Sequence, residues 1–315
     1  MSDISKRIEQ KIGVPNLAEI LAERIGAADL NSLLLDVYRR RAERRASATL
    51  LSEYVENRFV HLGQNDPRRL LEWDRTAFSL LPEGYVPVEL SPLCPLGTNS
   101  VVATVSQNKT VVTTRSLEVV SDATNVLALE CAVRRRALLK AAPGSAEMVR
   151  LAATHRVMRP QFVTNPRLLP HFRLFSLCSA GRDKGANSFL EAAMAEHVGF
   201  HLRALTTFLG KNSVFRVAVT DLASEIPSEG WLSVALAPLR EQFDRVEFCF
   251  DQSRTTGRGY YDTVCFKIHE VSSDTPVELA DGGSVDWTQK LLSNAKERLF
   301  ISGIGSERVC ALRHR

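Results

Sequence analysis

The spacing of apolar positions changes near residue 80, and this change predicts two kinds of structure along the chain. Before that point, apolar residues recur three or four positions apart, as Leu17, Ile20 and Leu21 do. Such spacing is typical of amphipathic helices. We therefore expect residues 1–78 to form a helical N-terminal region and residues 79–315 to form a separate unit.

Beyond residue 84, short β-branched or alternating runs are mixed with isolated helical segments. The run at 86–90 predicts a strand, and the runs at 101–105 and 110–114 predict the two strands of a hairpin. Because strands and helices do not alternate strictly, we expect an α+β fold with a mainly antiparallel sheet, flanked by helices. The other expected strands are 174–178, 215–219, 245–250, 263–268 and 298–302, and the expected helices are 124–139 and 189–209.

Composition narrows the class of protein. With 315 residues, 44% of them hydrophobic, the chain can bury a substantial core. A net charge of +4 is too small to indicate nucleic acid, and the basic run at 38–45 is expected to be a solvated helix face because Glu43 interrupts it. Six scattered cysteines without a Cys-x-x-Cys pair, and no long apolar stretch, favour a cytoplasmic protein with reduced thiols.

Three segments carry candidate chemistry. The closing run 300–309 predicts a strand, a glycine turn and a helix, where Arg308 could bind a phosphate, although tight packing explains such turns more often. Arg156 stands on the first arm of a predicted strand–loop–strand, which could also be an ordinary hairpin with surface arginines. Two glycine-rich turns near Tyr260 and Tyr261 are typical of the walls of a small-molecule pocket.

Taken in order, these segments resemble the catalytic core of class II aminoacyl-tRNA synthetases, most closely histidyl-tRNA synthetase and its synthetase-like paralogues. Each segment is modest alone, but their correct order over residues 80–310 makes chance unlikely. The segments that carry the resemblance are 84–92 for motif 1, 155–161 and 171–181 for the two arms of motif 2, 257–261 and 282–283 for the histidine-type signature and the later glycine strand, and 303–308 for motif 3.

The resemblance implies a six- or seven-stranded antiparallel sheet on which ATP binds with Mg²⁺. It implies that Arg156 bridges the α-phosphate and a substrate carboxylate, and that Arg308 clamps the γ-phosphate. These two arginines would be the catalytic residues, since they stabilise the charge that builds on the phosphate. The implied cofactor-binding residues are Arg156, Arg159, Phe172 and Arg308, and the implied substrate-binding residues are Asp122, Tyr260, Tyr261, Gly282 and Gly283.

The chain departs from the family's pattern at positions that matter for activity. Met158 stands where motif 2 has an acid near the adenine, and Thr256 and Gly259 stand where the signature has its Arg and Asp. Arg254 or Arg258 could supply the missing cation from a neighbouring position. The positions that read histidine in the family fall on Leu174 and Cys178.

Three functions follow from this pattern. One is a synthetase-like protein that binds ATP and a small amino or carboxylic acid and forms an acyl-adenylate. The second is a catalytically silent sensor or regulatory subunit with a protein partner, like the synthetase-like subunit of ATP phosphoribosyltransferase. The third, a full tRNA synthetase, is least favoured because no anticodon-binding domain follows motif 3, so tRNA is not an expected partner. Motif 1 implies a homodimer.

One pair of histidines offers an alternative site. His197 and His201 stand four positions apart on a predicted helix and could supply two ligands to a metal ion. No convincing third ligand accompanies them in the sequence. A hydrogen-bonded pair on the helix face is the preferred interpretation, and no metal site is predicted.

Overall fold

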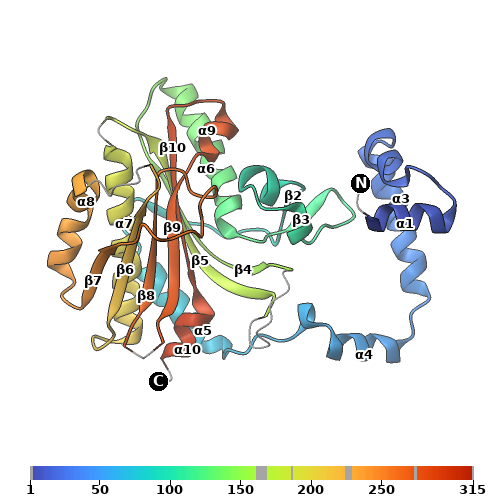
Figure 1. Cartoon of the computed structure of the whole chain (residues 1–315), viewed down its shortest axis with the longest axis horizontal. Helices are drawn as coiled ribbons and strands as arrows, with labels where there is room; N and C mark the ends of the chain where they lie inside the picture. The colour runs from blue at the N-terminus through green and yellow to red at the C-terminus, as the bar shows by residue number, and fades with distance from the viewer. Residues whose placement is uncertain (1–2, 161–168, 186, 224–228, 273–274, 314–315) are drawn as a thin grey trace.

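One mixed sheet of eight strands, counted over the described residues, forms the centre of the fold (Figure 1). The computed structural model describes residues 3–160, 169–185, 187–223, 229–272 and 275–313. The strands are β1 (Tyr85–Pro87), β4 (Val149–Met158), β5 (His171–Arg182), β6 (Phe215–Asp221), β7 (Val246–Phe250), β8 (Val264–Glu270), β9 (Val277–Val285) and β10 (Glu297–Gly305). Their order across the sheet is β1-β4-β5-β10-β9-β8-β6-β7.

The pairing of these strands confirms a mainly antiparallel sheet. At the two edges, β1 pairs in parallel with β4 and β7 pairs in parallel with β6, whereas the other neighbouring strands run antiparallel. The sheet is therefore wider than the implied six or seven strands, and its edges are parallel. The predicted strand–loop–strand is present as the β4–β5 hairpin, in which Arg156 lies opposite Arg173. Gln161 of the motif 2 arm lies outside the described residues.

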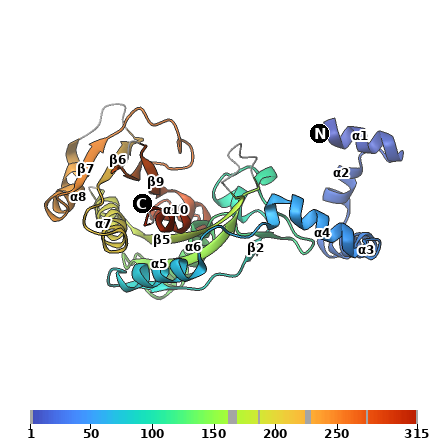
Figure 2. The same ribbon diagram turned by 90° about the horizontal axis from the view of Figure 1, so that it is seen from below.

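The sheet separates two hydrophobic cores because successive side chains of a strand point to opposite faces. On β10, Phe300 and Ile304 belong to one core, and Leu299 and Ile301 belong to the other. Figure 2 shows the helices layered on the sheet, and the core contacts assign them to its faces. The first face is covered by α5 (Pro67–Ser79), α7 (Ser188–Leu209), α8 (Glu229–Gln242) and α10 (Ser306–Leu312), and the second by α6 (Ala123–Ala141) and α9 (Trp287–Leu292).

The N-terminal region is helical, as its apolar spacing predicts, and it extends away from the sheet (Figures 1 and 2). Of its described side chains before α5, only that of Glu9 is buried. No described helix is both long and apolar enough to cross a membrane. The elements of this region are α1 (Asp3–Ile12), α2 (Leu17–Glu19), η1 (Ile20–Arg24), α3 (Ala27–Glu43), α4 (Ser47–Glu56) and η2 (Arg58–Val60).

Helix α5 differs from the helices before it because it packs on the sheet. Leu70, Trp73 and Ala77 recur at helical spacing and are buried in the first core. The Trp73 indole Nε1 donates to Ser306 Oγ at 3.1 Å, which joins α5 to the start of α10. The packed core therefore reaches back to α5, while the division between residues 78 and 79 stays a prediction about domains.

The predicted hairpin at 101–105 and 110–114 is wrong. Those residues contain the short helices η3 (Thr98–Val102) and η4 (Gln107–Lys109), and the antiparallel ribbon here is β2 (Leu93–Pro95) with β3 (Leu117–Val119). The physical reason is Glu118, whose buried carboxylate accepts hydrogen bonds from the Asn99 backbone and from the side chains of Asn99 and Gln107. The chain folds around this carboxylate because a buried charge without partners is costly.

Candidate functional site

A cavity of about 680 Å³ lies over β5, β9 and β10, beside the N-terminal end of α6. Its walls come from segments that are far apart in the sequence, between the linker at 63–65 and α10. The structure brings most of the predicted site residues into this one pocket, and Arg156, Gly282 and Gly283 do not line it. The predicted residues that line it are Asp122, Arg159, Phe172, Tyr260, Tyr261 and Arg308.

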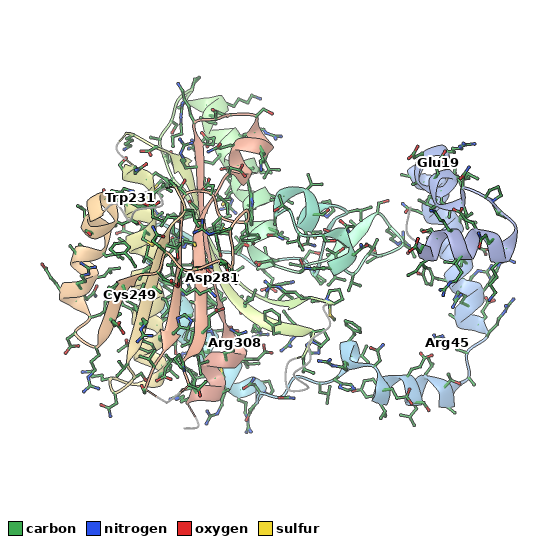
Figure 3. All side chains as sticks on the ribbon, viewed as in Figure 1. Glu19, Arg45, Trp231, Cys249, Asp281 and Arg308 are labelled. Carbon is green, nitrogen blue, oxygen red and sulfur yellow. The ribbon has the colours of Figure 1, made fainter. Side chains whose placement is uncertain are left out.

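Small residues in register make room for the pocket above the sheet. Gly303 on β10 lies between Ser176 on β5 and Asp281 on β9. A methyl group built on Gly303 would find its nearest neighbour, Ser176 Oγ, at 3.6 Å. A methyl group would thus fit at this position of the closing motif in ordinary van der Waals contact. Figure 3 shows Asp281 on the sheet and Arg308 at the start of α10.

Gly282 and Gly283 are required by packing. A Cβ on Gly282 would lie 2.6 Å from Ser302 Cβ and 2.7 Å from the Ile301 carbonyl oxygen. A Cβ on Gly283 would lie 2.4 Å from the Val264 carbonyl oxygen. Since any side chain would collide with the neighbouring strands, these glycines allow β9 to approach them closely. A direct substrate contact by either glycine stays a prediction.

Arg156 lies at the rim of the pocket and is tied to two residues that line it. Its Nη2 donates to Glu307 Oε1 at 2.9 Å, and its Nη1 lies 2.9 Å from His171 Nδ1. Glu307 Oε2 accepts from the Arg173 backbone N–H at 2.7 Å, which fixes the carboxylate. The Arg156 side chain is 38% exposed, so it can still be reached from the solvent side.

Asp122 caps α6 and pairs with Arg159. Asp122 Oδ1 accepts from the backbone N–H and the hydroxyl of Thr124, at 3.0 and 2.8 Å. Asp122 Oδ2 accepts from Arg159 Nη2 at 2.7 Å. The Arg159 guanidinium lies 5.1 Å from the centre of the Phe172 ring, within the range of a cation–π contact. Both oxygens of Asp122 are therefore already engaged.

At the signature turn, Arg254 forms an ion pair with Asp281, a residue of the pocket lining, and its role as the missing cation stays a prediction. Arg254 Nη2 lies 3.0 Å from both carboxylate oxygens of Asp281, and its guanidinium stacks on Tyr261 at 5.7 Å. Arg258 only donates from Nε to the Arg254 carbonyl oxygen. The turn at Gly257, whose φ is +88°, brings Arg254 against Tyr261. Burial raises the pKa of Asp281, and the charge of Arg254 opposes that rise.

Arg308 reaches across to β9 from the start of α10. Its Nη1 donates to the Glu278 backbone carbonyl oxygen at 2.9 Å, and its side chain is 51% exposed. Glu278 also accepts from Lys267 Nζ at 2.6 Å. Burial raises the pKa of Glu278, but the hydrogen bond and the charge of Lys267, with Arg308, outweigh it and lower the pKa overall.

Acidic and basic side chains alternate around the pocket in ion pairs. Asp122 pairs with Arg159, and each of the other carboxylates in the lining has its own cation. A phosphate entering the pocket would compete with these carboxylates for the same guanidinium groups. The lining carboxylates are Asp122, Glu278, Asp281 and Glu307, and the lining cations are Lys109, Arg159 and Arg308. Three further cations, Arg156, Arg254 and Lys267, lie beside the lining and pair with its carboxylates.

Sequence reasoning missed Asp281, Glu278 and Glu307 as site residues. Asp281 directly precedes the glycine pair 282–283, and Glu307 directly precedes Arg308. Their position next to a motif was the sequence signal that could have indicated them as site residues. Glu278 carries no such signal. Its role depends on the register of β8 and β9, which brings it near the Lys267 side chain.

His197 and His201 are buried and hydrogen-bonded. His197 Nδ1 and His201 Nε2 each lie 2.8 Å from Ser302 Oγ, and His197 Nε2 lies 3.0 Å from Ser179 Oγ. Burial lowers the pKa of both imidazoles, to about 3 for His201. Among the described residues no group of three potential ligands could hold a metal ion. The contacts support the hydrogen-bonded interpretation of this pair, which anchors α7 to β10.

Comparison with known proteins identifies the fold. No protein-family model and no curated protein sequence matches the chain. Among solved structures, apo histidyl-tRNA synthetase from S. aureus matches with a TM-score of 0.56 at 12% identity, over 78% of this chain and 65% of that enzyme. This chain thus spans less than two thirds of the S. aureus enzyme.

Two shorter proteins match over more of their length. An ATP phosphoribosyltransferase regulatory subunit/histidyl-tRNA synthetase from Bacillus halodurans C matches with a TM-score of 0.58 at 14% identity, over 81% of this chain and 82% of that one. A histidine–tRNA ligase subunit from Alicyclobacillus acidocaldarius matches with a TM-score of 0.58 at 13% identity, over 81% and 96%. The predicted α+β fold of class II synthetase cores is thereby confirmed.

Proposed function

We propose that this chain binds ATP and a small amino or carboxylic acid in the pocket and joins them as an acyl-adenylate. One observation carries the proposal: Asp122, Arg159, Phe172, Tyr260, Tyr261 and Arg308, which come from separate segments, line a single cavity. A volume of about 680 Å³ is in the range of small-molecule sites. The fold shared with synthetase-like proteins adds support.

The reaction needs cations that stabilise charge on the phosphates, and the acid itself supplies the nucleophile. A carboxylate oxygen of the acid bonds to the α-phosphorus, the bond to the bridging oxygen breaks, and pyrophosphate leaves with its electron pair. Arg156 pairs with Glu307, Arg308 follows Glu307 in the sequence, and both arginines would stabilise the charge that develops on the phosphates. Substrate binding would require Arg156 to exchange its Glu307 contact for a phosphate oxygen.

Magnesium fits this arrangement as a companion of the phosphates. Mg²⁺ prefers oxygen ligands and is commonly held by one or two carboxylates together with substrate phosphates and water. Glu278 and Glu307 line the pocket near Arg308 and offer such oxygens. The ion would neutralise phosphate charge, and the protein side chains would orient the acid and the nucleotide.

A second candidate function is a catalytically silent sensor or regulatory subunit. Met158 offers no acid toward an adenine, and the arginines at the site are held in ion pairs by neighbouring carboxylates. Such pairing keeps the site stable without a nucleotide, which suits a protein that binds a metabolite alone. The Bacillus halodurans C protein is described as a regulatory subunit/histidyl-tRNA synthetase.

ATP–pyrophosphate exchange across the standard amino acids tests the proposal, together with calorimetry of ATP binding. Arg308→Ala is expected to weaken ATP binding about tenfold to a hundredfold, since it removes a charge-assisted hydrogen bond. Arg240→Ala, an exposed position away from the pocket, is the matched control. Absence of both ATP binding and exchange contradicts the proposal, and ATP or acid binding without exchange favours the regulatory function.

Self-association is proposed through the edge of the sheet. Among the described strands, β1 pairs with β4 alone, and Val86 on it is 45% exposed. An exposed strand edge with apolar side chains favours pairing with another chain. Light scattering on the full chain should give the mass of a dimer, and Val86→Lys should reduce dimer formation. A strict monomer contradicts the homodimer, and co-purification would be needed for any other protein partner.

A further inference from the structure

A chain of buried hydrogen bonds leads from Glu118 to the wall of the pocket. Glu118 Oε1 accepts from the Asn99 backbone N–H at 2.7 Å and from Asn99 Nδ2 at 2.8 Å. Asn99 Oδ1 in turn accepts from Asn125 Nδ2 at 3.0 Å. Asn125 is 1% exposed, lies in the first turn of α6 and lines the pocket. Its Oδ1 is buried and has no hydrogen-bond partner among the described residues.

The Glu118 carboxylate, at the start of this series of hydrogen bonds, fixes the orientation of the Asn99 and Asn125 side-chain amides. Glu118 Oε1 accepts from Asn99, and Glu118 Oε2 accepts from Gln107 Nε2 at 2.6 Å, so the whole carboxylate acts as an acceptor. Asn99 must therefore turn its NH₂ group toward Glu118 and its oxygen toward Asn125. Asn125 must then donate with its NH₂ group, and its oxygen remains as an acceptor.

The unpaired acceptor Asn125 Oδ1 indicates which kind of ligand group would bind beside it. A buried polar atom without a partner costs free energy, so a ligand that supplies the missing donor gains affinity. The nearest acid on the helix, Asp122, already accepts from Thr124 and Arg159. Among the described residues in and next to the first turn of α6, no carboxylate is thus free to balance a cation. A neutral donor suits this acceptor better than an ammonium group does.

We propose that Asn125 Oδ1 is a specificity-determining group that accepts a hydrogen bond from an uncharged N–H or O–H on the side chain of the bound amino acid. Leu174 and Ile301 line the same pocket and would contact the apolar part of that side chain. Glu118 is a positioning residue, because it acts only through Asn99. This inference rests on the proposed function, since it assumes that the pocket holds a small amino acid.

The experiment compares pairs of amino acids that differ by one hydrogen-bond donor. Calorimetry measures binding of threonine and valine, serine and alanine, and tyrosine and phenylalanine, with ATP present, to wild type and to Asn125→Ala. Where a pair binds wild type, we expect the donor-bearing member to bind with about tenfold higher affinity than the apolar member. Asn125→Ala is expected to reduce this preference to about twofold or less, with little change for the apolar member.

A second variant changes the network without removing the acceptor at the pocket wall. In Glu118→Gln the side-chain oxygen must stay toward the Asn99 backbone N–H, which can only donate, so Asn99 and Asn125 keep their orientation. This variant keeps every lining residue and is expected to retain the preference. Continued binding of the apolar member shows that the pocket is intact, and Asn212→Ala, an exposed asparagine, is the matched control.

The outcomes separate this inference from the proposed function. Loss of the donor preference in Asn125→Ala, together with its retention in Glu118→Gln, supports it. An unchanged preference in Asn125→Ala overturns it and leaves the proposed function standing. If no amino acid binds wild type in the presence of ATP, this inference fails, and the ATP calorimetry and pyrophosphate exchange decide separately whether the proposed function stands.

Discussion

Acid should loosen the attachment of α7 to the strand that floors the pocket, and His201 allows the size of this effect to be worked out. His201 is fully buried, its Nε2 lies 2.8 Å from Ser302 Oγ, and its Nδ1 has no partner among the described residues. Burial lowers its pKa from 6.5 to about 3. The folded state therefore favours the neutral imidazole, and protonation favours unfolding.

The pH window follows from these two pKa values. The contribution of His201 is fully present above the unfolded pKa of 6.5 and is lost as the pH falls toward about 3. Each pKa unit corresponds to about 1.4 kcal/mol, so the full loss is about 5 kcal/mol and the loss between pH 7 and pH 5 is about 2 kcal/mol. His197, whose pKa is also lowered by burial, adds to the effect in the same direction.

Urea unfolding at pH 7 and pH 5 measures this loss directly. His201→Gln keeps a polar group near Ser302 but removes the titration, so its unfolding free energy should fall by about 2 kcal/mol less than that of wild type over this interval. Phe200→Leu destabilises the same core without removing a titrating group, and should keep the pH dependence of wild type. If His201→Gln and wild type lose equal stability between the two pH values, the reasoning is refuted.

Two further predictions concern packing and a buried charge, both measured by urea unfolding. Gly282→Ala should cost about 1–3 kcal/mol because its Cβ would lie 2.6 Å from neighbouring side chains, whereas Gly303→Ala, with 3.6 Å of space, should cost less than about 1 kcal/mol. Equal costs would contradict the packing role of Gly282. Arg135→Met removes the two hydrogen bonds to the fully buried carboxylate of Glu297 and leaves it only Arg182, at 4.0 Å, so it should cost about 3–5 kcal/mol. Arg134→Met, in a part-exposed pair, should cost under about 1 kcal/mol. A loss of less than about 1 kcal/mol in Arg135→Met would refute the importance of its pair with Glu297.

Most of the strands and helices could be predicted because apolar periodicity is a local property. The expected helix at 189–209 is α7, and the expected strand at 215–219 lies within β6. The hairpin prediction failed because the strand preference of β-branched residues is weak and depends on the contacts around them. Here the chain instead folds so that the buried carboxylate of Glu118 is hydrogen-bonded, and neither its burial nor its partners are visible in the sequence.

The candidate site also contains residues that the sequence predicted and residues that only the structure revealed. The order of motifs predicted that Arg159 and Arg308 would meet in one pocket, although they are far apart along the chain. It left Arg254 and Arg258 as alternatives, because two residues of the same type near a turn cannot be distinguished without its geometry. The turn at Gly257 brings Arg254 against Asp281, and the choice between the two arginines as the missing cation stays a prediction. Asn125 was not predicted at all, because an asparagine in a helical run has no signal of its own.

The sequence by itself determined the type of each main element, the order of the motifs and the arginines that could meet a phosphate. These depend on residue identity and on spacing within one element. The tertiary structure decided which groups face each other. Arg156 pairs with Glu307, 151 residues away, and Ser176, Gly303 and Asp281 align across the sheet only because strand register fixes them. Register is set by the packing of both faces of the sheet together, so no local pattern specifies it.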